Sequence, residues 1–105
     1  MSVLAIFRYD VAPGRMDEFM AKLGDAASAR FTSPAMPNAV RLFRSATAGR
    51  ENLTLLIEYN DRAAYDARTA YETANPEWRR LFDPAPDSPE RLISREVLTE
   101  TWLPG

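Results

Sequence analysis

Two residue types that carry much of protein chemistry are missing from this chain of 105 residues. Without cysteine there is no disulfide, no thiolate nucleophile and no zinc ribbon. Without histidine the chain lacks the commonest metal and haem ligand and the usual general base near neutral pH. Any chemistry must therefore use carboxylates, arginines, Lys22, tyrosines, hydroxyl groups, the backbone or a bound cofactor. Since no residue pattern points to a metal or to a particular cofactor, we expect neither.

Long apolar runs and blocks of one charge are absent as well. No segment approaches the roughly 18 apolar residues of a membrane helix, and no basic stretch precedes the first apolar residues as it does in a signal peptide. The 13 basic and 15 acidic residues are interspersed and leave a net charge of -2, so neither nucleic acid nor an anionic membrane is an expected partner. We expect a soluble cytoplasmic protein with a single domain over residues 1–105.

Alternating and helical spacings of apolar residues predict the secondary structure. The expected strands cover residues 3–10, 39–46, 53–59 and 92–102, and a hairpin turn is expected at 47–51. The expected helices cover residues 15–29 and 61–74, with a short further helix ending near residue 82. The apolar stripe of the second helix is predicted to comprise Ala64, Ala67, Tyr71 and Ala74, with Tyr65 beside it.

The predicted helix boundaries depend on a few specific residues. Asn60 or Asp61 can cap the second helix, and Asn75 followed by Pro76 is a typical start for the short one. Gly24 lies within the first predicted helix, where it costs about 1 kcal/mol relative to alanine. Either close packing on the sheet or an early end of the helix would explain it.

The order strand, helix, strand, strand, helix, strand predicts an α+β, ferredoxin-like fold: a four-stranded antiparallel sheet with two helices on one face. Both faces of that sheet carry apolar residues, because Leu4 and Ile6 alternate with Phe7, and Leu56 alternates with Ile57. Two helices can cover only one face. The other needs a second cover, and a second copy of the chain is the simplest one, so we predict a homodimer.

Charged residues in the middle of the strands are the main candidates for a site. They either pair across strands or line a cavity that holds an anionic ligand. Among them Glu58, Arg44 and Arg95 are the catalytic candidates. Glu58 could accept a proton or pair with an arginine, and an arginine could stabilise an oxyanion. The charged set is Arg8, Arg41, Arg44, Glu58, Arg95 and Glu96.

An aromatic set could line a ligand pocket between the helices and the sheet. Core packing with the hydroxyl groups at the surface explains the same tyrosines equally well, and Trp78 with Phe82 could simply anchor the short helix. The pocket candidates are Tyr9, Tyr59, Tyr65, Tyr71 and Trp78.

Three segments resemble the NIPSNAP-like proteins of the dimeric α+β barrel superfamily. Residues 9–15, with Phe19 four positions on, resemble the first strand-to-helix junction of the family. Residues 58–65 resemble its second junction, and residues 75–78 (Asn-Pro-Glu-Trp) resemble its Asp/Asn-Pro-x-Trp element. The resemblance implies a dimer whose two sheets form a barrel with the helices outside.

The resemblance leaves the activity open. Related families on this fold include cofactor-independent monooxygenases, polyketide cyclases, haem-degrading enzymes and chlorite dismutases, and the last two depend on a histidine ligand. The leading hypothesis is a NIPSNAP-like homodimer that binds a small hydrophobic or aromatic acid between helices and sheet. The alternatives are a cofactor-independent monooxygenase or polyketide-type cyclase, and a structural or interaction domain without a ligand.

Overall fold

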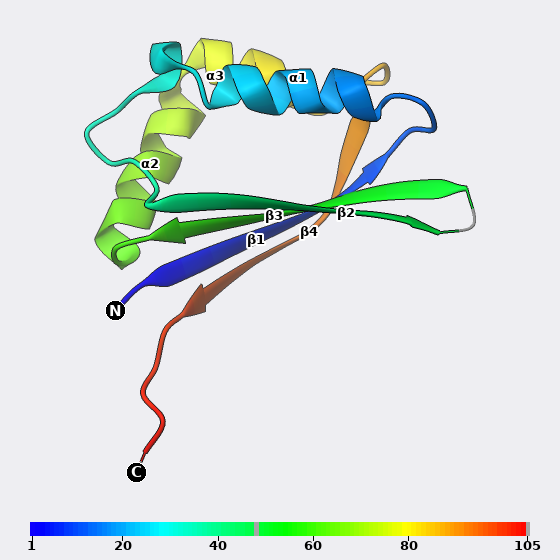
Figure 1. Ribbon diagram of the computed structural model, residues 1–105. Helices are drawn as coiled ribbons and strands as arrows, with labels where there is room; N and C mark the ends of the chain where they lie inside the picture. The colour runs from blue at the N-terminus through cyan, green and yellow to red at the C-terminus, as the bar shows by residue number, and fades with distance from the viewer. Residues whose placement is uncertain (48, 105) are drawn as a thin grey trace.

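A single antiparallel sheet of four strands forms the centre of the computed structural model, which describes residues 1–47 and 49–104 (Figure 1). The strands are β1 (Val3–Val11), β2 (Ala39–Thr47), β3 (Arg50–Tyr59) and β4 (Glu90–Thr99). Their order across the sheet is β2-β3-β1-β4, so β1 and β3 are central. Helical connections follow both central strands, which confirms the predicted ferredoxin-like α+β fold.

Three α-helices lie on one side of this sheet in the described part of the chain. They are α1 (Met16–Ala26), α2 (Arg62–Ala74) and α3 (Pro76–Phe82), and a short 3₁₀ helix at Ala29–Phe31 follows α1. In Figure 1, α2 stands at one end of the sheet and rises toward α1 and α3, which lie further from the strands. None of the helices described is long and apolar enough to cross a bilayer.

The predicted helix caps are confirmed. Asp61 caps α2, because its carboxylate accepts a hydrogen bond from the Ala64 N–H at 2.8 Å. Asn75 caps α3, since its side-chain oxygen accepts from the N–H groups of Glu77 and Trp78 at 2.9 and 3.3 Å. These bonds satisfy amides that have no partner within the helix.

The first helix is shorter than predicted. It ends at Ala26 rather than at residue 29, because the chain then tightens into the 3₁₀ helix and turns Phe31 into the core, with its ring 5.2 Å from that of Trp78. A Cβ atom at Gly24 would meet no atom within 4 Å. Close packing on the sheet therefore does not explain this glycine. The end of the helix at Ala26, two residues after Gly24, agrees with the second explanation, an early end of the helix.

The last strand was predicted at 92–102 but spans Glu90–Thr99. It begins earlier because Glu90 lies opposite Val11, and it ends earlier because its partner strand begins at Val3. Beyond it, the Glu100 N–H still donates to the Ser2 carbonyl at 2.9 Å. The predicted turn at 47–51 includes Ala48, which lies outside the described residues.

The two sides of the sheet differ in their cover. The helix side carries two buried clusters, one around Phe19 and Leu53 and the other around Tyr59 and Tyr65. The opposite side, here called the open side, has no helix over it among the described residues. Register places five apolar side chains on it: Leu4, Ile6, Phe43, Leu56 and Leu98. The predicted sheet with two apolar sides is therefore confirmed.

Candidate functional site

The three catalytic candidates lie on different sides of the sheet. Glu58 is opposite Leu4 in the register and so faces the open side. Arg44 on β2 is opposite Leu53, and Arg95 on β4 is opposite Phe7, so both arginines face the helix side at the two edges of the sheet. The sheet separates Glu58 from both arginines, so within one subunit they cannot act on the same molecule.

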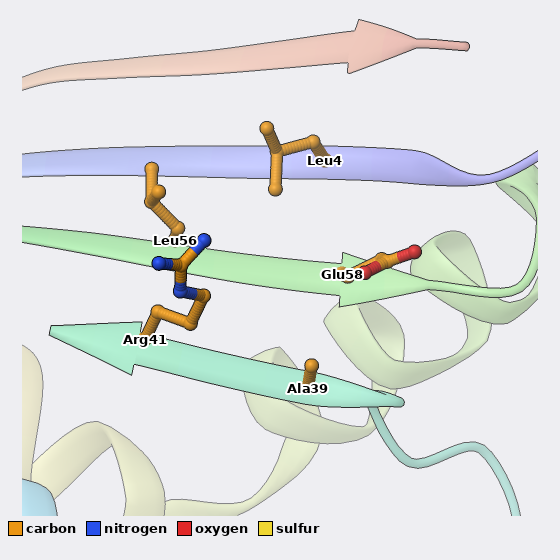
Figure 2. Close-up of a pocket in the computed structure, with 5 residues that line it drawn as sticks. All are labelled: Leu4, Ala39, Arg41, Leu56 and Glu58. Atoms are coloured by element: carbon orange, nitrogen blue, oxygen red, sulfur yellow. The ribbon is translucent and has the colours of Figure 1, made fainter.

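A hollow on the open side contains Glu58 (Figure 2). Its volume is about 240 Å³, and it is lined by Leu4, Ala39, Arg41, Leu56 and Glu58. The helices lie behind the sheet in this view, and the Arg41 side chain extends over Leu56. This hollow belongs to the surface that a second subunit would cover, not to the space between helices and sheet.

Some of the mid-strand charges pair with each other. Arg8 on β1 and Glu96 on β4 form an ion pair at 3.3 Å, which is the cross-strand pairing predicted as one alternative. Glu58, Arg44 and Arg95 form no ion pair within residues 1–47 and 49–104. Since Arg44 and Arg95 are exposed on the helix side, they remain free to bind an anion.

The helix side of β2 is accessible although it faces the helical layer. Val40 and Leu42 alternate along this side of the strand and are 54% and 39% exposed. Arg44 follows them on the same side and is exposed as well. The helical layer thus leaves the edge strand uncovered. The result is an apolar strip that ends in a guanidinium group, here called the β2 strip (Val40, Leu42 and Arg44).

The predicted tyrosines form the inner part of the helix side. The rings of Tyr59 and Tyr65 lie 5.5 Å apart at 80°, and those of Tyr9 and Phe19 lie 4.9 Å apart. Burial raises the pKa of Tyr9 to about 12, with smaller contributions from the negative charges of Glu90 and Glu72. Burial likewise raises the pKa of Tyr59 to about 12. A tyrosine is protonated at neutral pH even without this shift, so both phenols are hydrogen-bond donors there.

Tyr71 and Trp78 flank a buried arginine. Arg68 on α2 is only 3% exposed, and its guanidinium carbon lies 4.8 Å from the Tyr71 ring and 5.2 Å from the Trp78 ring. Its Nη1 donates to the Phe31 carbonyl at 2.6 Å and to the Ser33 hydroxyl at 3.0 Å. Arg68 thus ties α2 to the segment that leads into β2.

Glu72, one turn further along α2, is the partner of this arginine. Its Oε2 accepts a hydrogen bond from Arg68 Nε at 2.9 Å, and its side chain is 24% exposed. Burial raises the pKa of Glu72 although Arg68 acts in the opposite direction. Its charge also raises the pKa of Tyr9 and of Tyr59, so Glu72 acts electrostatically on both phenols.

Sequence reasoning missed Arg68 and Glu72 because it misplaced the buried stripe of α2. Tyr65 and Arg68 are buried, whereas Ala67 and Ala74 of the predicted stripe are exposed. Tyr65, Arg68 and Glu72 follow the i, i+3, i+7 spacing of one helix face. This spacing of a tyrosine and a charged pair along one helix face was the signal in the sequence that could have identified Arg68 and Glu72.

The fold and these sites therefore define the class of protein. It is a ferredoxin-like α+β protein in which one face of the sheet and one edge strand are accessible among the described residues. The sequence model of the NIPSNAP family matches residues 4–101, so the chain belongs to the NIPSNAP family. No protein with a curated description matches the chain significantly.

Solved structures share the fold at low sequence identity. An uncharacterized NIPSNAP-like domain protein from Burkholderia xenovorans has a TM-score of 0.65 and 19% identity, over 99% of this chain and 90% of that one. A dimeric ferredoxin-like protein from an uncultured marine organism has a TM-score of 0.66 and 17% identity, over 96% and 98%. A candidate antibiotic biosynthesis monooxygenase from Chloroflexus aurantiacus has a TM-score of 0.66 and 12% identity, over 100% and 98%.

Proposed function

We propose that this protein is a homodimer in which each subunit binds a small hydrophobic or aromatic acid on the helix side of its sheet. The observation that carries the binding proposal is the β2 strip. Val40 and Leu42 are exposed where a sheet normally meets its helices, and Arg44 ends the strip. Apolar surface beside an unpaired guanidinium group in the described structure is complementary to an aromatic ring that carries a carboxylate. The cytoplasmic location stays a prediction.

Titration calorimetry with cinnamic acid and with its methyl ester tests the binding proposal. The Arg44→Ala variant should bind the acid roughly ten- to a hundredfold more weakly, because a hydrogen bond to a charged group contributes about 1.5–3 kcal/mol. Its affinity for the ester should stay unchanged. Arg41→Ala is the matched control, since Arg41 lies on the same strand but on the open side.

Three outcomes would contradict the proposal. Loss of binding in Arg95→Ala but not in Arg44→Ala would move the site to the β4 edge. Equal effects of Arg44→Ala on acid and ester would exclude recognition of the carboxylate. Absence of binding in the wild type would favour the third reading, a structural or interaction domain without a ligand.

The dimer proposal depends on the open side. Phe43 and Leu98 are 46% and 43% exposed there, next to Leu4 and Leu56. Four strands about 4.8 Å apart and some nine residues long present a face of roughly 19 by 30 Å. With its projecting side chains this approaches the roughly 800 Å² per partner of a standard interface. A solved structure of the same fold is described as dimeric, which supports a second copy of the chain as the partner on this side.

Sedimentation equilibrium tests the dimer. The wild type should have the mass of two subunits at micromolar concentration, and Phe43→Glu should have the mass of one, because a carboxylate would be buried without a partner. Leu103→Glu is the control, since Leu103 is 93% exposed and lies beyond the last strand. A monomeric wild type would refute this half of the proposal.

A second candidate function is oxidation of an activated aromatic or polyketide-like substrate by dioxygen. Tyr9 supports it, because its phenol lies on the same side of the sheet as Arg44 and can donate a hydrogen bond to the oxyanion of a substrate carbanion. Conversion of a CH₂ group and O₂ to a carbonyl group and water balances without a cofactor. Oxygen uptake with anthrone as substrate tests this function, and Tyr9→Phe should slow it at least tenfold. Unchanged uptake in that variant would refute the role of Tyr9.

A further inference from the structure

Beyond its last strand the described chain continues as a short segment, here called the C-terminal tail (residues 100–104). The tail carries two highly exposed apolar side chains, Trp102 at 74% and Leu103 at 93%. Figure 1 shows it running away from the helices, below the sheet. We propose that Trp102 of each subunit inserts into the hollow on the open side of its partner. This inference rests on the dimer proposed above and names a contact that each tail makes in it.

The tail and the hollow lie at the same end of the sheet. One row of opposed residues crosses all four strands at this end: Leu98, Leu4, Glu58 and Ala39. The last three of them line the hollow. Just beyond β4, the Glu100 N–H donates to the Ser2 carbonyl at 2.9 Å, and the Ser2 hydroxyl donates to Glu100 Oε1 at 3.2 Å. The tail is therefore fixed at its start, and the residues from 101 onward project from this end.

Two-fold symmetry can bring the tail of one subunit to the hollow of the other. The edge strands of the sheet are β2 and β4. When two such sheets face each other across an axis parallel to their strands, β4 of each subunit lies over β2 of its partner, and the same ends of both sheets coincide. The partner's tail then emerges beside Ala39. The extended chain from Thr99 to Trp102 spans about 10 Å, and two packed sheets are also about 10 Å apart.

The hollow has the chemistry that suits an indole ring. It combines apolar side chains with a guanidinium group and a carboxylate, and the Arg41 side chain extends over Leu56 (Figure 2). An indole face can pack on the apolar residues and against the guanidinium group, and its N–H can donate to the Glu58 carboxylate. The volume of about 240 Å³ is below the roughly 300–1,000 Å³ of small-molecule pockets. A single inserted side chain therefore suits this hollow better than a free ligand does.

The dimer itself creates the need for a donor at this place. A second subunit over the open side removes Glu58 from water, and this carboxylate forms no ion pair within residues 1–47 and 49–104. Burying a carboxylate without a hydrogen-bond donor is costly, and the Trp102 N–H supplies one. In an extended tail, Leu103 points to the opposite side from Trp102. Leu103 thus stays outside the hollow, which agrees with its use above as a control position for the dimer.

The dissociation constant of the dimer, measured by sedimentation equilibrium, tests the contribution of Trp102. Trp102→Ala should raise it roughly tenfold or more, because a buried tryptophan is a typical hot spot and each dimer contains two copies of the contact. Leu103→Ala is the matched control and should leave it unchanged. A wild-type dimer that Trp102→Ala does not weaken would overturn this inference and leave the proposed dimer intact. A monomeric wild type would refute both.

Cross-linking identifies the place that the tail occupies. The chain has no cysteine, so a short bismaleimide joins only introduced thiols. Leu103→Cys combined with Ala39→Cys should give a covalent dimer on a denaturing gel, and neither single variant should. Leu103→Cys combined with Ser45→Cys should give none, because Ser45 lies on the same side of β2 near its far end. A product with the mass of one subunit, both thiols joined, would place the tail over its own sheet and overturn the inference, as would the absence of any cross-link to position 39.

Discussion

Replacing Arg68 with alanine should destabilise the fold more than any exposed arginine substitution. The change leaves three acceptors without their donor: the Phe31 carbonyl, the Ser33 hydroxyl and the Glu72 carboxylate. It also removes a cation from between the rings of Tyr71 and Trp78. Because Arg68 is 3% exposed, water cannot replace these partners without opening the junction of α2, α3 and the 3₁₀ helix.

Breaking a buried ion pair by removing one partner costs about 3–5 kcal/mol. A domain of this size has a total stability of about 5–15 kcal/mol, so the variant should fold but with a narrow margin. Each kcal/mol corresponds to roughly 4–8 °C in melting temperature. The expected loss is therefore roughly 12–40 °C.

Urea unfolding followed by tryptophan fluorescence measures the loss, at one protein concentration because a dimer is stabilised by mass action. Arg62→Ala is the matched control, since Arg62 lies on the same helix and pairs with Asp66 at 3.0 Å, but both are about 60% exposed. That variant should change the free energy of unfolding by less than about 0.5 kcal/mol. A loss below about 1 kcal/mol in Arg68→Ala would refute the view that Arg68 holds this junction together.

Three smaller predictions concern the helices and the phenols. Gly24→Ala should raise the free energy of unfolding by about 0.5–1 kcal/mol, because alanine favours the helix and its Cβ meets nothing. Gly14→Ala, at a φ of 75°, should lower the free energy of unfolding. A change of the same sign in both variants would contradict this prediction. Asn75→Ala should cost about 1 kcal/mol through loss of the α3 cap, and Asn75→Asp should restore most of it; an alanine variant as stable as the wild type would contradict the cap. In an alkaline titration of phenolate absorbance, Tyr9 and Tyr59 should ionise near pH 12. Since their folded pKa lies above the unfolded value of about 10, the stability that they contribute is complete below pH 10 and is lost toward pH 12. A titration with every phenol near 10 would refute their burial.

Short-range rules predicted the fold well because its determinants are local. Alternation within 3–10 and the Leu- and Ile-rich run at 53–59 placed the two central strands, and the side chains of Asp61 and Asn75 marked the starts of α2 and α3. The apolar residues on both sides of β1 also indicated a sheet that its own helices could not cover. Each of these signals lies within one strand or one turn, where sterics and hydrogen bonding decide the conformation.

The site was harder to predict because it depends on how distant segments meet. The shared side of Arg44 and Tyr9 follows from the register of β2 on β3 and of β3 on β1, which three separate strands determine. Parity within β3 could have shown that Glu58 faces away from Leu55 and Ile57. Nothing local shows that Arg68 meets the Phe31 carbonyl, which lies 37 positions earlier in the chain.

The two sides of this sheet suit two separate tasks. The open side has apolar residues and a hollow of about 240 Å³, and a second subunit that covered it would also bury Glu58. The helix side keeps its accessible charge at Arg44, which dimerisation through the open side would leave free. Because Phe43 and Arg44 are neighbours on β2 with side chains on opposite sides of the sheet, Phe43→Glu should abolish the dimer but leave the affinity for the acid unchanged. Arg44→Ala should weaken acid binding but leave the dimer intact. If both predictions hold, a single sheet separates assembly on one side from ligand recognition on the other.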